Sequence, residues 1–69
     1  MNTPKALKAL KQHFSTQEAT AEALGVSQQA VSNWMKGKHG MNSIIALRAE
    51  KVTAGEIKAV WLCPELANI

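Results

Sequence analysis

The 69-residue sequence is poor in cysteine and has no long run of apolar residues. Its single cysteine, Cys63, cannot form an internal disulfide. No segment is long or apolar enough to serve as a signal peptide or to span a membrane. We therefore expect a protein of the reducing cytoplasm that has no membrane partner.

The sequence also lacks the residue patterns of catalysis and of metal binding. His13 and His39 have no partner ligands at metal-binding spacing, and Cys63 has no basic residue beside it to activate its thiol. A chain of this length forms one small domain that buries about 60% of its unfolded surface, which leaves little room for a catalytic cleft. We expect no enzyme activity, no cofactor and no metal.

The residues that are present favour a folded domain with a modest positive charge. Hydrophobic residues make up 46% of the chain, and eight Lys and Arg against five Asp and Glu give a net charge of +3. This apolar content favours folding over disorder, and the charge suits a polyanionic partner without requiring one. No linker, repeat or low-complexity segment divides the chain, so we expect a single domain over residues 1–69.

Helix caps and apolar residues at helical spacing predict an all-helical chain. Thr3 followed by Pro4 is typical of a cap and a first helical position, and we expect the first helix over residues 4–13. Ser15 and Glu18 have the spacing of a capping box, which marks the start of a second helix.

A tight turn is predicted between the second and third helices. The second helix covers residues 16–24, and Gly25 follows at the position where a left-handed residue is favoured. Ser27 can cap a third helix only two residues later. That helix ends at Met35 or Lys36, before the breaker sequence KGKHG.

Ser43 can start a fourth helix, for which Gly55 is the expected C-terminal stop. The apolar residues of this helix are Ile44, Leu47 and Val52.

The tail after Gly55 fits either a short strand or a short helix. Ile57, Ala59 and Trp61 alternate as in a strand, but Ile57 and Trp61 also lie one helical turn apart. We favour a helical turn over residues 59–62 and keep the strand as the alternative.

The third helix has two chemically different faces. At 3.6 residues per turn, its core side carries Ala30, Val31, Trp34 and Met35. The opposite side carries Gln28, Gln29, Ser32, Asn33 and Lys36. A side-chain amide presents a donor and an acceptor at the separation that adenine N6 and N7 require in the major groove. Lysine and glutamate, the usual residues of a solvated helix face, cannot present that pair. The alternative is an ordinary polar surface.

Residues 17–34, QEATAEALGVSQQAVSNW, resemble the helix-turn-helix of the phage repressor and Cro proteins. The resemblance lies in a small Ala21 where the two helices touch, Gly25 in the turn, and apolar residues at fixed positions. The last group comprises Leu24, Val26, Val31 and Trp34.

The resemblance extends beyond this motif. The segments HFSTQEATAEALGVS and EKVTAG resemble small lambdoid Cro proteins, and VTAGEIKAVWLCPEL resembles the tail of the YdaS-type regulators. Together these matches cover residues 3–66. They imply a lambda-repressor-like fold of five short helices, with the helix-turn-helix at residues 17–36.

In this family the third helix enters the major groove, so the resemblance implies roles for particular residues. It places four residues at base-reading positions: Gln28, Gln29, Ser32 and Asn33. It assigns phosphate contacts to Gln17 and Ser27, aided by helix-start amides, and we expect further contacts from Lys36 and Lys38.

The second helix departs from the family pattern. Glu18 and Glu22 lie on its outer face, where related proteins carry neutral or basic residues, and carboxylates near phosphates weaken binding. Thr20 replaces a bulky apolar residue, so we expect slightly loose packing around it.

We expect a sequence-specific regulator of the Cro or repressor type that binds double-stranded DNA at a pseudo-palindromic operator. A weak homodimer would form on the DNA, with Trp61 and Leu62 as the contact. One alternative is the DNA-binding antitoxin of a toxin–antitoxin pair, whose partner would be a toxin. Another is a protein-interaction adaptor that keeps the fold without DNA affinity, which Glu18 and Glu22 favour.

Overall fold

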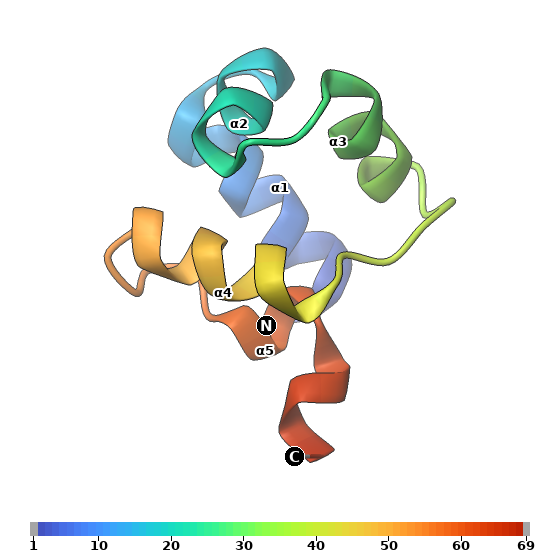
Figure 1. The fold of residues 1–69 in the computed structure, drawn as a ribbon, viewed down its shortest axis with the longest axis vertical. Coiled ribbons are helices and arrows are strands. Elements are labelled where there is room, and N and C mark those ends of the chain that lie inside the picture. The colour runs from blue at the N-terminus through green and yellow to red at the C-terminus, as the bar shows by residue number, and fades with distance from the viewer. Residues whose placement is uncertain (1, 69) are drawn as a thin grey trace.

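The computed structural model describes residues 2–68, and within them it contains five α-helices, one 3-10 helix and no strand (Figure 1). The elements are α1 (Thr3–Phe14), α2 (Gln17–Leu24), α3 (Gln28–Met35), α4 (Ser43–Val52), α5 (Ala59–Leu62) and η1 (Pro64–Asn68). The predicted all-α class with five helices is confirmed. The tail forms the helical turn at residues 59–62, so the strand alternative is wrong.

Two helices begin at a cap one residue away from the predicted one. Asn2, and not Thr3, caps α1, and its Oδ1 accepts a hydrogen bond from the Lys5 N–H at 3.0 Å. Thr16, and not Ser15, caps α2, where its Oγ1 accepts from the Ala19 N–H at 3.0 Å.

The predicted capping box between Ser15 and Glu18 is therefore wrong. Ser15 ends α1 instead, with a left-handed φ of 76°, and its backbone N–H donates to the Gln12 carbonyl. A residue in this conformation cannot also take the extended backbone that an N-cap requires.

The turn between α2 and α3 forms as predicted. Gly25 is left-handed, with φ 69° and ψ 31°, and the Val26 N–H donates to the Ala21 carbonyl at 3.0 Å. Ser27 caps α3 through a 3.1 Å hydrogen bond from the Ala30 N–H to its Oγ. Only three residues separate the two helices, which fixes the direction of α3 relative to α2.

One side chain ties this motif to the rest of the domain. Arg48, on α4, donates from Nη1 to the carbonyl oxygen of Leu24, the last residue of α2, at 2.6 Å. A positive guanidinium at the C-terminal end of a helix satisfies an orphan carbonyl and complements the helix dipole.

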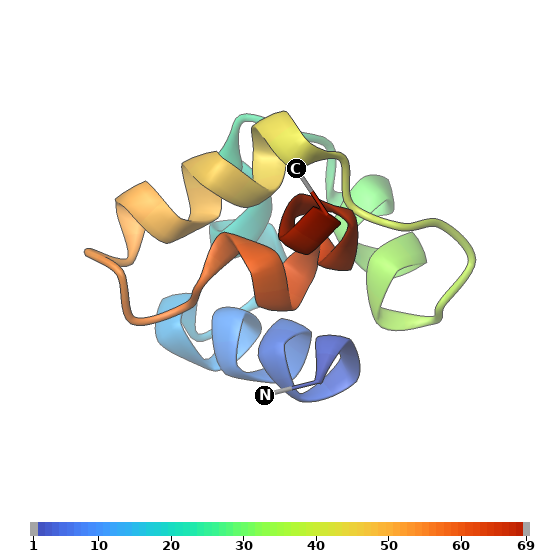
Figure 2. The ribbon, with the colours of Figure 1, turned by 90° about the horizontal axis from the view of Figure 1, so that it is seen from below.

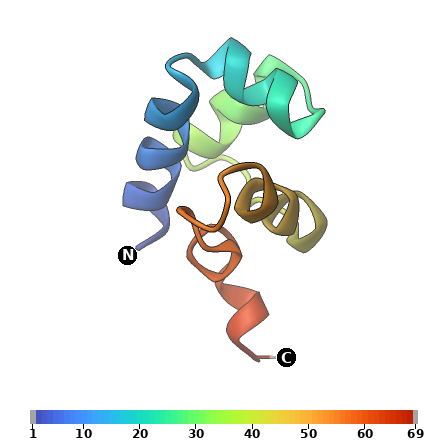
Figure 3. The same ribbon diagram turned by 90° about the vertical axis from the view of Figure 1, so that its left-hand side faces the viewer.

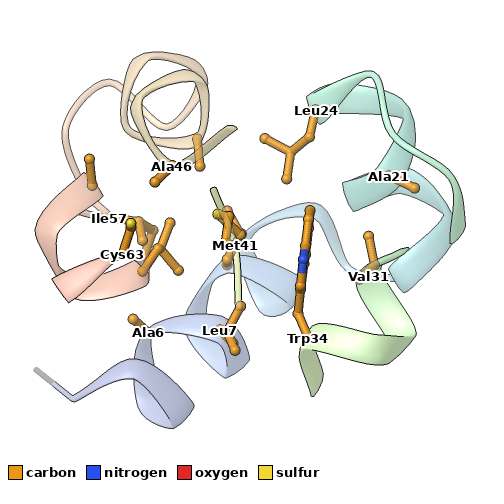
Figure 4. Close-up of a cluster of buried hydrophobic side chains, with 14 residues drawn as sticks. Ala6, Leu7, Ala21, Leu24, Val31, Trp34, Met41, Ala46, Ile57 and Cys63 are labelled. Atoms are coloured by element: carbon orange, nitrogen blue, oxygen red, sulfur yellow. The ribbon is translucent and has the colours of Figure 1, made fainter. Parts of the chain in front are cut away.

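The core lies where α1, α2, α3, α4 and α5 converge (Figure 4). Trp34 reaches into it from α3, and Met41 contributes from the loop after α3. The core face predicted for α3 is confirmed: Val31 and Trp34 are buried, while Ala30 and Met35 are half-buried against the core.

Thr20 packs more tightly than expected. Its side chain is 1% exposed, and its hydroxyl donates to the Thr16 carbonyl at 2.7 Å. Within residues 2–68, no buried side-chain polar atom lacks a hydrogen-bond partner. The expectation of loose packing at Thr20 is therefore wrong.

The fourth helix buries small residues and exposes large ones. Ala46 and Ala49 are fully buried, whereas Ile44 is 68% exposed and Leu47 is 54% exposed. Val52 is exposed as well. The apolar residues that mark this helix in the sequence therefore point largely to solvent.

The fifth helix lies between α4 and α1 when the molecule is seen from below (Figure 2). Its start is fixed by Glu50 of α4, whose Oε1 accepts from the Ala59 N–H at 2.7 Å. Leu62 is 2% exposed and belongs to the core. In the side view, α2 and α3 lie at one end of the molecule and η1 projects at the other (Figure 3).

Candidate nucleic-acid interface

Four predicted base-reading residues form one neutral polar surface, which we call the outer face of α3. Gln28 and Gln29 are exposed, and Ser32 and Asn33 are half-buried. All four side chains carry hydrogen-bonding groups without a formal charge. Because the opposite face of α3 is anchored in the core by Val31 and Trp34, these groups are held outward by the packing of the whole helix.

Gln17 joins this surface from the neighbouring helix. Gln17, the first residue of α2, lines a hollow of about 260 Å³ together with Gln28, Gln29 and Ser32. The structure thus brings a predicted phosphate-contacting residue beside three predicted base-reading residues. The lining consists of amides and one hydroxyl, which together offer both donors and acceptors.

Two amides of the outer face contact each other. Gln29 Nε2 donates to Asn33 Oδ1 at 3.1 Å, across one turn of α3. The bond links two residues that we predict to read bases.

Ser27 lies at the start of the outer face and has two hydrogen-bonding functions. Its Oγ accepts the capping bond from the Ala30 N–H, while its own O–H proton is left to donate elsewhere. The side chain is exposed. It is thus available to an external acceptor such as a phosphate oxygen.

The two predicted lysines lie at the other end of α3. The Lys36 N–H donates to the Ser32 carbonyl, and the Lys38 N–H donates to the Asn33 carbonyl at 2.9 Å. Gly37 between them is left-handed, with φ 75°, which closes the helix. Both lysine side chains are exposed, so each end of the outer face has groups that suit phosphates.

Comparison with known proteins finds a matching family and named relatives. Residues 8–67 match the family described as "Bacterial toxin YdaS". The chain is also 51% identical over 57 residues to "Regulatory protein cro" of Pseudomonas phage D3, a match that covers 83% of this chain and 78% of that protein. The chain belongs to the Cro/YdaS-type family.

A second relative in the Cro/YdaS-type family is "Regulatory protein cro" of Salmonella phage P22. It is 50% identical over 46 residues, covering 67% of this chain and 70% of that protein. No solved structure matches the chain significantly.

The fold of this Cro/YdaS-type chain brings two further residues, His39 and Asn42, near the outer face of α3. The sequence alone did not indicate either of them as part of the site. His39 and Asn42 line a second hollow, of about 340 Å³, together with Asn33. Their proximity depends on the path of the loop between α3 and α4. No spacing in the sequence predicts that path.

The predicted dimer contacts are not brought together as a surface patch. Leu62, predicted as a dimer contact, is buried in the core of the single chain, so its side chain is not presented on the surface. Trp61 is half-buried against the same core and keeps part of its surface. The large exposed apolar side chains lie elsewhere, on α4 and at Val60 of α5.

The acidic residues of α2 face solvent. Glu18 and Glu22 are both exposed, and neither forms a side-chain hydrogen bond or ion pair within residues 2–68. Their charges therefore act on any ligand that approaches α2.

The described part of the chain contains no group of three or more His, Cys, Asp or Glu side chains that could hold a metal ion. None of its helices is both long and apolar enough to cross a membrane.

Proposed function

We propose that this chain is a transcriptional regulator that binds operator DNA by inserting α3 into the major groove. The outer face of α3 carries the proposal, because it is a continuous neutral surface of amides and a hydroxyl, held outward by a buried opposite face. Two relatives bear the name regulatory protein, which supports the regulatory role.

In this proposal the four outer-face residues read base edges. Gln28, Gln29 and Asn33 supply amide pairs suited to adenine, and Ser32 supplies a hydroxyl that suits several bases. Lys36 and Lys38 neutralise phosphates at one end of α3. Gln17 and Ser27 donate to phosphates at the other end, where helix-start amides add partial positive charge.

The proposed operator is pseudo-palindromic. One recognition helix reads about four or five base pairs, which is too few to select a unique site, so two copies bind half-sites about 34 Å apart. A chain of this size has a small surface for self-contact, and small interfaces are weak. The homodimer therefore forms mainly on the DNA.

Selection of binding sites from a random pool of duplex DNA tests this proposal. We expect a motif with two related half-sites to be enriched. A Gln28→Ala, Gln29→Ala double variant that keeps the wild-type circular dichroism spectrum should lose the motif. Enrichment of no motif by the wild-type chain would refute operator binding and favour the adaptor alternative.

The family's description as a bacterial toxin supports a second candidate, a member of a toxin–antitoxin pair. As an antitoxin, the chain would bind both DNA and a toxin; as a toxin, it would arrest growth. Two measurements separate these roles from that of a simple regulator. They are capture of a toxin partner from the native host and growth of bacteria expressing the wild-type chain or the same double variant.

A further inference from the structure

The hydrogen bond from Gln29 to Asn33 links two side chains on the surface that we propose to face DNA. Within residues 2–68, it is the one hydrogen bond between two neutral side chains. Gln28, on the same helical turn as Gln29, forms no side-chain hydrogen bond in this part of the chain. The outer face thus contains one linked pair and one unlinked glutamine.

The linked amides retain a specific set of hydrogen-bonding groups. An amide nitrogen carries two hydrogens, and an amide oxygen has two lone pairs. With one Nε2 hydrogen directed to Asn33, Gln29 keeps its second Nε2 hydrogen and its Oε1 atom. That donor and acceptor are the two groups needed by adenine N7 and N6.

The link also couples the directions of the two amides. If the Gln29 amide alone turned over, its Oε1 would face Asn33 Oδ1, and two acceptors would oppose each other. The bond is kept only if both amides turn over together. In either arrangement Gln29 retains a donor and an acceptor for a base.

We propose that Gln29 and Asn33 act as one reading unit, in which Asn33 positions the Gln29 amide for bidentate binding of adenine. This proposal rests on the proposed function and adds a division of roles between two residues of the outer face. Asn33 is a positioning residue for the base that Gln29 contacts. Holding the amide in place before binding lowers the entropy lost on binding, an effect worth about two- to tenfold per side chain.

A double-mutant cycle on the selected operator tests the unit. The four proteins are wild type, Gln29→Ala, Asn33→Ala and the double variant. Each is measured on the operator and on duplexes altered at one base pair. At the adenine read by Gln29, Gln29→Ala should lower discrimination by roughly 5- to 150-fold.

Asn33→Ala should lower discrimination at that same adenine by about two- to tenfold. The double variant should be no worse there than Gln29→Ala alone, because residues that act together have non-additive effects. Asn33→Asp keeps an acceptor for Gln29 Nε2. It should restore the adenine preference while weakening binding to all DNA through its negative charge.

Gln28→Ala is the matched control. Its effect should add to that of Asn33→Ala, because Gln28 has no bond to Asn33. Circular dichroism and thermal unfolding of each variant establish that the fold is kept.

The outcomes separate this proposal from the proposed function. A wild-type chain that selects no site refutes both. If the wild type is selective but Gln29→Ala relaxes no adenine-containing position, the reading unit is wrong and operator binding stands. The same conclusion follows if Asn33→Ala leaves the Gln29 position unchanged, or if the two single effects add.

Discussion

Gln28 and Lys38 lie at opposite ends of α3, and they differ in the DNA contact that each can make. Gln28→Ala should cost about 1–3 kcal/mol at the cognate site and relax preference at one base pair. Lys38→Ala should weaken binding to specific and random DNA alike and flatten the salt dependence by about one unit of slope. Salt titrations of binding to both kinds of DNA measure this contrast. If the two variants behave alike on both, the assignment of the outer face is wrong.

Gly25 is required by the turn itself. Its φ is +69°, and a Cβ there would lie 3.1 Å from Arg48 Nη1, the atom that donates to the Leu24 carbonyl. Gly25→Ala should therefore lower the free energy of unfolding by about 1–2 kcal/mol, the cost of a left-handed residue with a side chain. Denaturant unfolding measures the change.

Gly40→Ala is the control for this substitution, because a Cβ at Gly40 meets nothing within 4 Å and its φ is not in the left-handed range. It should be neutral or stabilising by up to about 1 kcal/mol. An equal decrease in the free energy of unfolding in both variants would show that the turn does not depend on the left-handed glycine.

The caps show what a sequence can determine at this scale. Asn2 stands beside Thr3, and Ser15 stands beside Thr16, so in each pair two neighbouring residues have side chains able to cap. Backbone conformation decides between them, and that conformation depends on how the preceding chain enters the helix. Ser27 was predicted correctly because neither neighbour can cap as well as serine.

At the scale of elements, α4 shows why hydrophobicity alone did not identify the buried face. Ala46 and Ala49 have no exposed surface, while Ile44 and Leu47 face solvent. The helix packs against both α2 and α5, and small side chains suit such close neighbours. The sequence predicted the helix itself and its start at Ser43, but the helix ends at Val52 with Thr53 as its C-cap, before the expected stop at Gly55. Its orientation depends on contacts with helices distant in the sequence, and these cannot be derived from one segment.

The acidic face of α2 gives a test of how that helix lies on DNA. Glu22 is exposed and has no partner among the described side chains, so its charge should repel nearby phosphates. Glu22→Gln should strengthen non-specific binding to DNA and make the affinity depend more steeply on salt concentration. Titration with random duplex DNA at several salt concentrations measures both effects.

Glu65→Gln makes the same change in net charge at an exposed position in η1, at the opposite end of the molecule from α2 and α3 (Figure 3). This variant should strengthen non-specific DNA binding less than Glu22→Gln does. Equal strengthening by both variants would mean that only total charge matters and that α2 does not overlie the phosphates.

At the scale of the whole molecule, the sequence determined the composition of the candidate site but not its internal contacts. The helical period placed Gln28, Gln29, Ser32 and Asn33 on one face, and the structure agrees. Gln17 lies close to these residues because the turn between α2 and α3 is tight. The hydrogen bond between Gln29 and Asn33 depends on side-chain rotamers, which spacing permits but does not select.

The exposed apolar side chains lead to a prediction of how two copies assemble on DNA. Leu62 is buried, so we expect two copies to meet through exposed apolar side chains, chiefly Ile44 and Leu47 on one face of α4. The wild type should sediment as a monomer or weak dimer and bind two half-sites cooperatively. Leu47→Gln should remove the cooperativity while leaving the affinity for a single half-site unchanged.

Val52→Gln is the matched control, because Val52 lies about 140° from Leu47 around the helix axis. It should leave the cooperativity intact.

Trp61→Ala tests the remaining residue of the predicted contact. Thermal unfolding of this variant is measured as well, because Trp61 also packs on the core. Sedimentation of the free proteins and binding curves on duplexes with one and two half-sites decide the question. Equal affinity per half-site for the wild type would rule out the dimer, and loss of single-site binding by Leu47→Gln would place α4 against DNA instead.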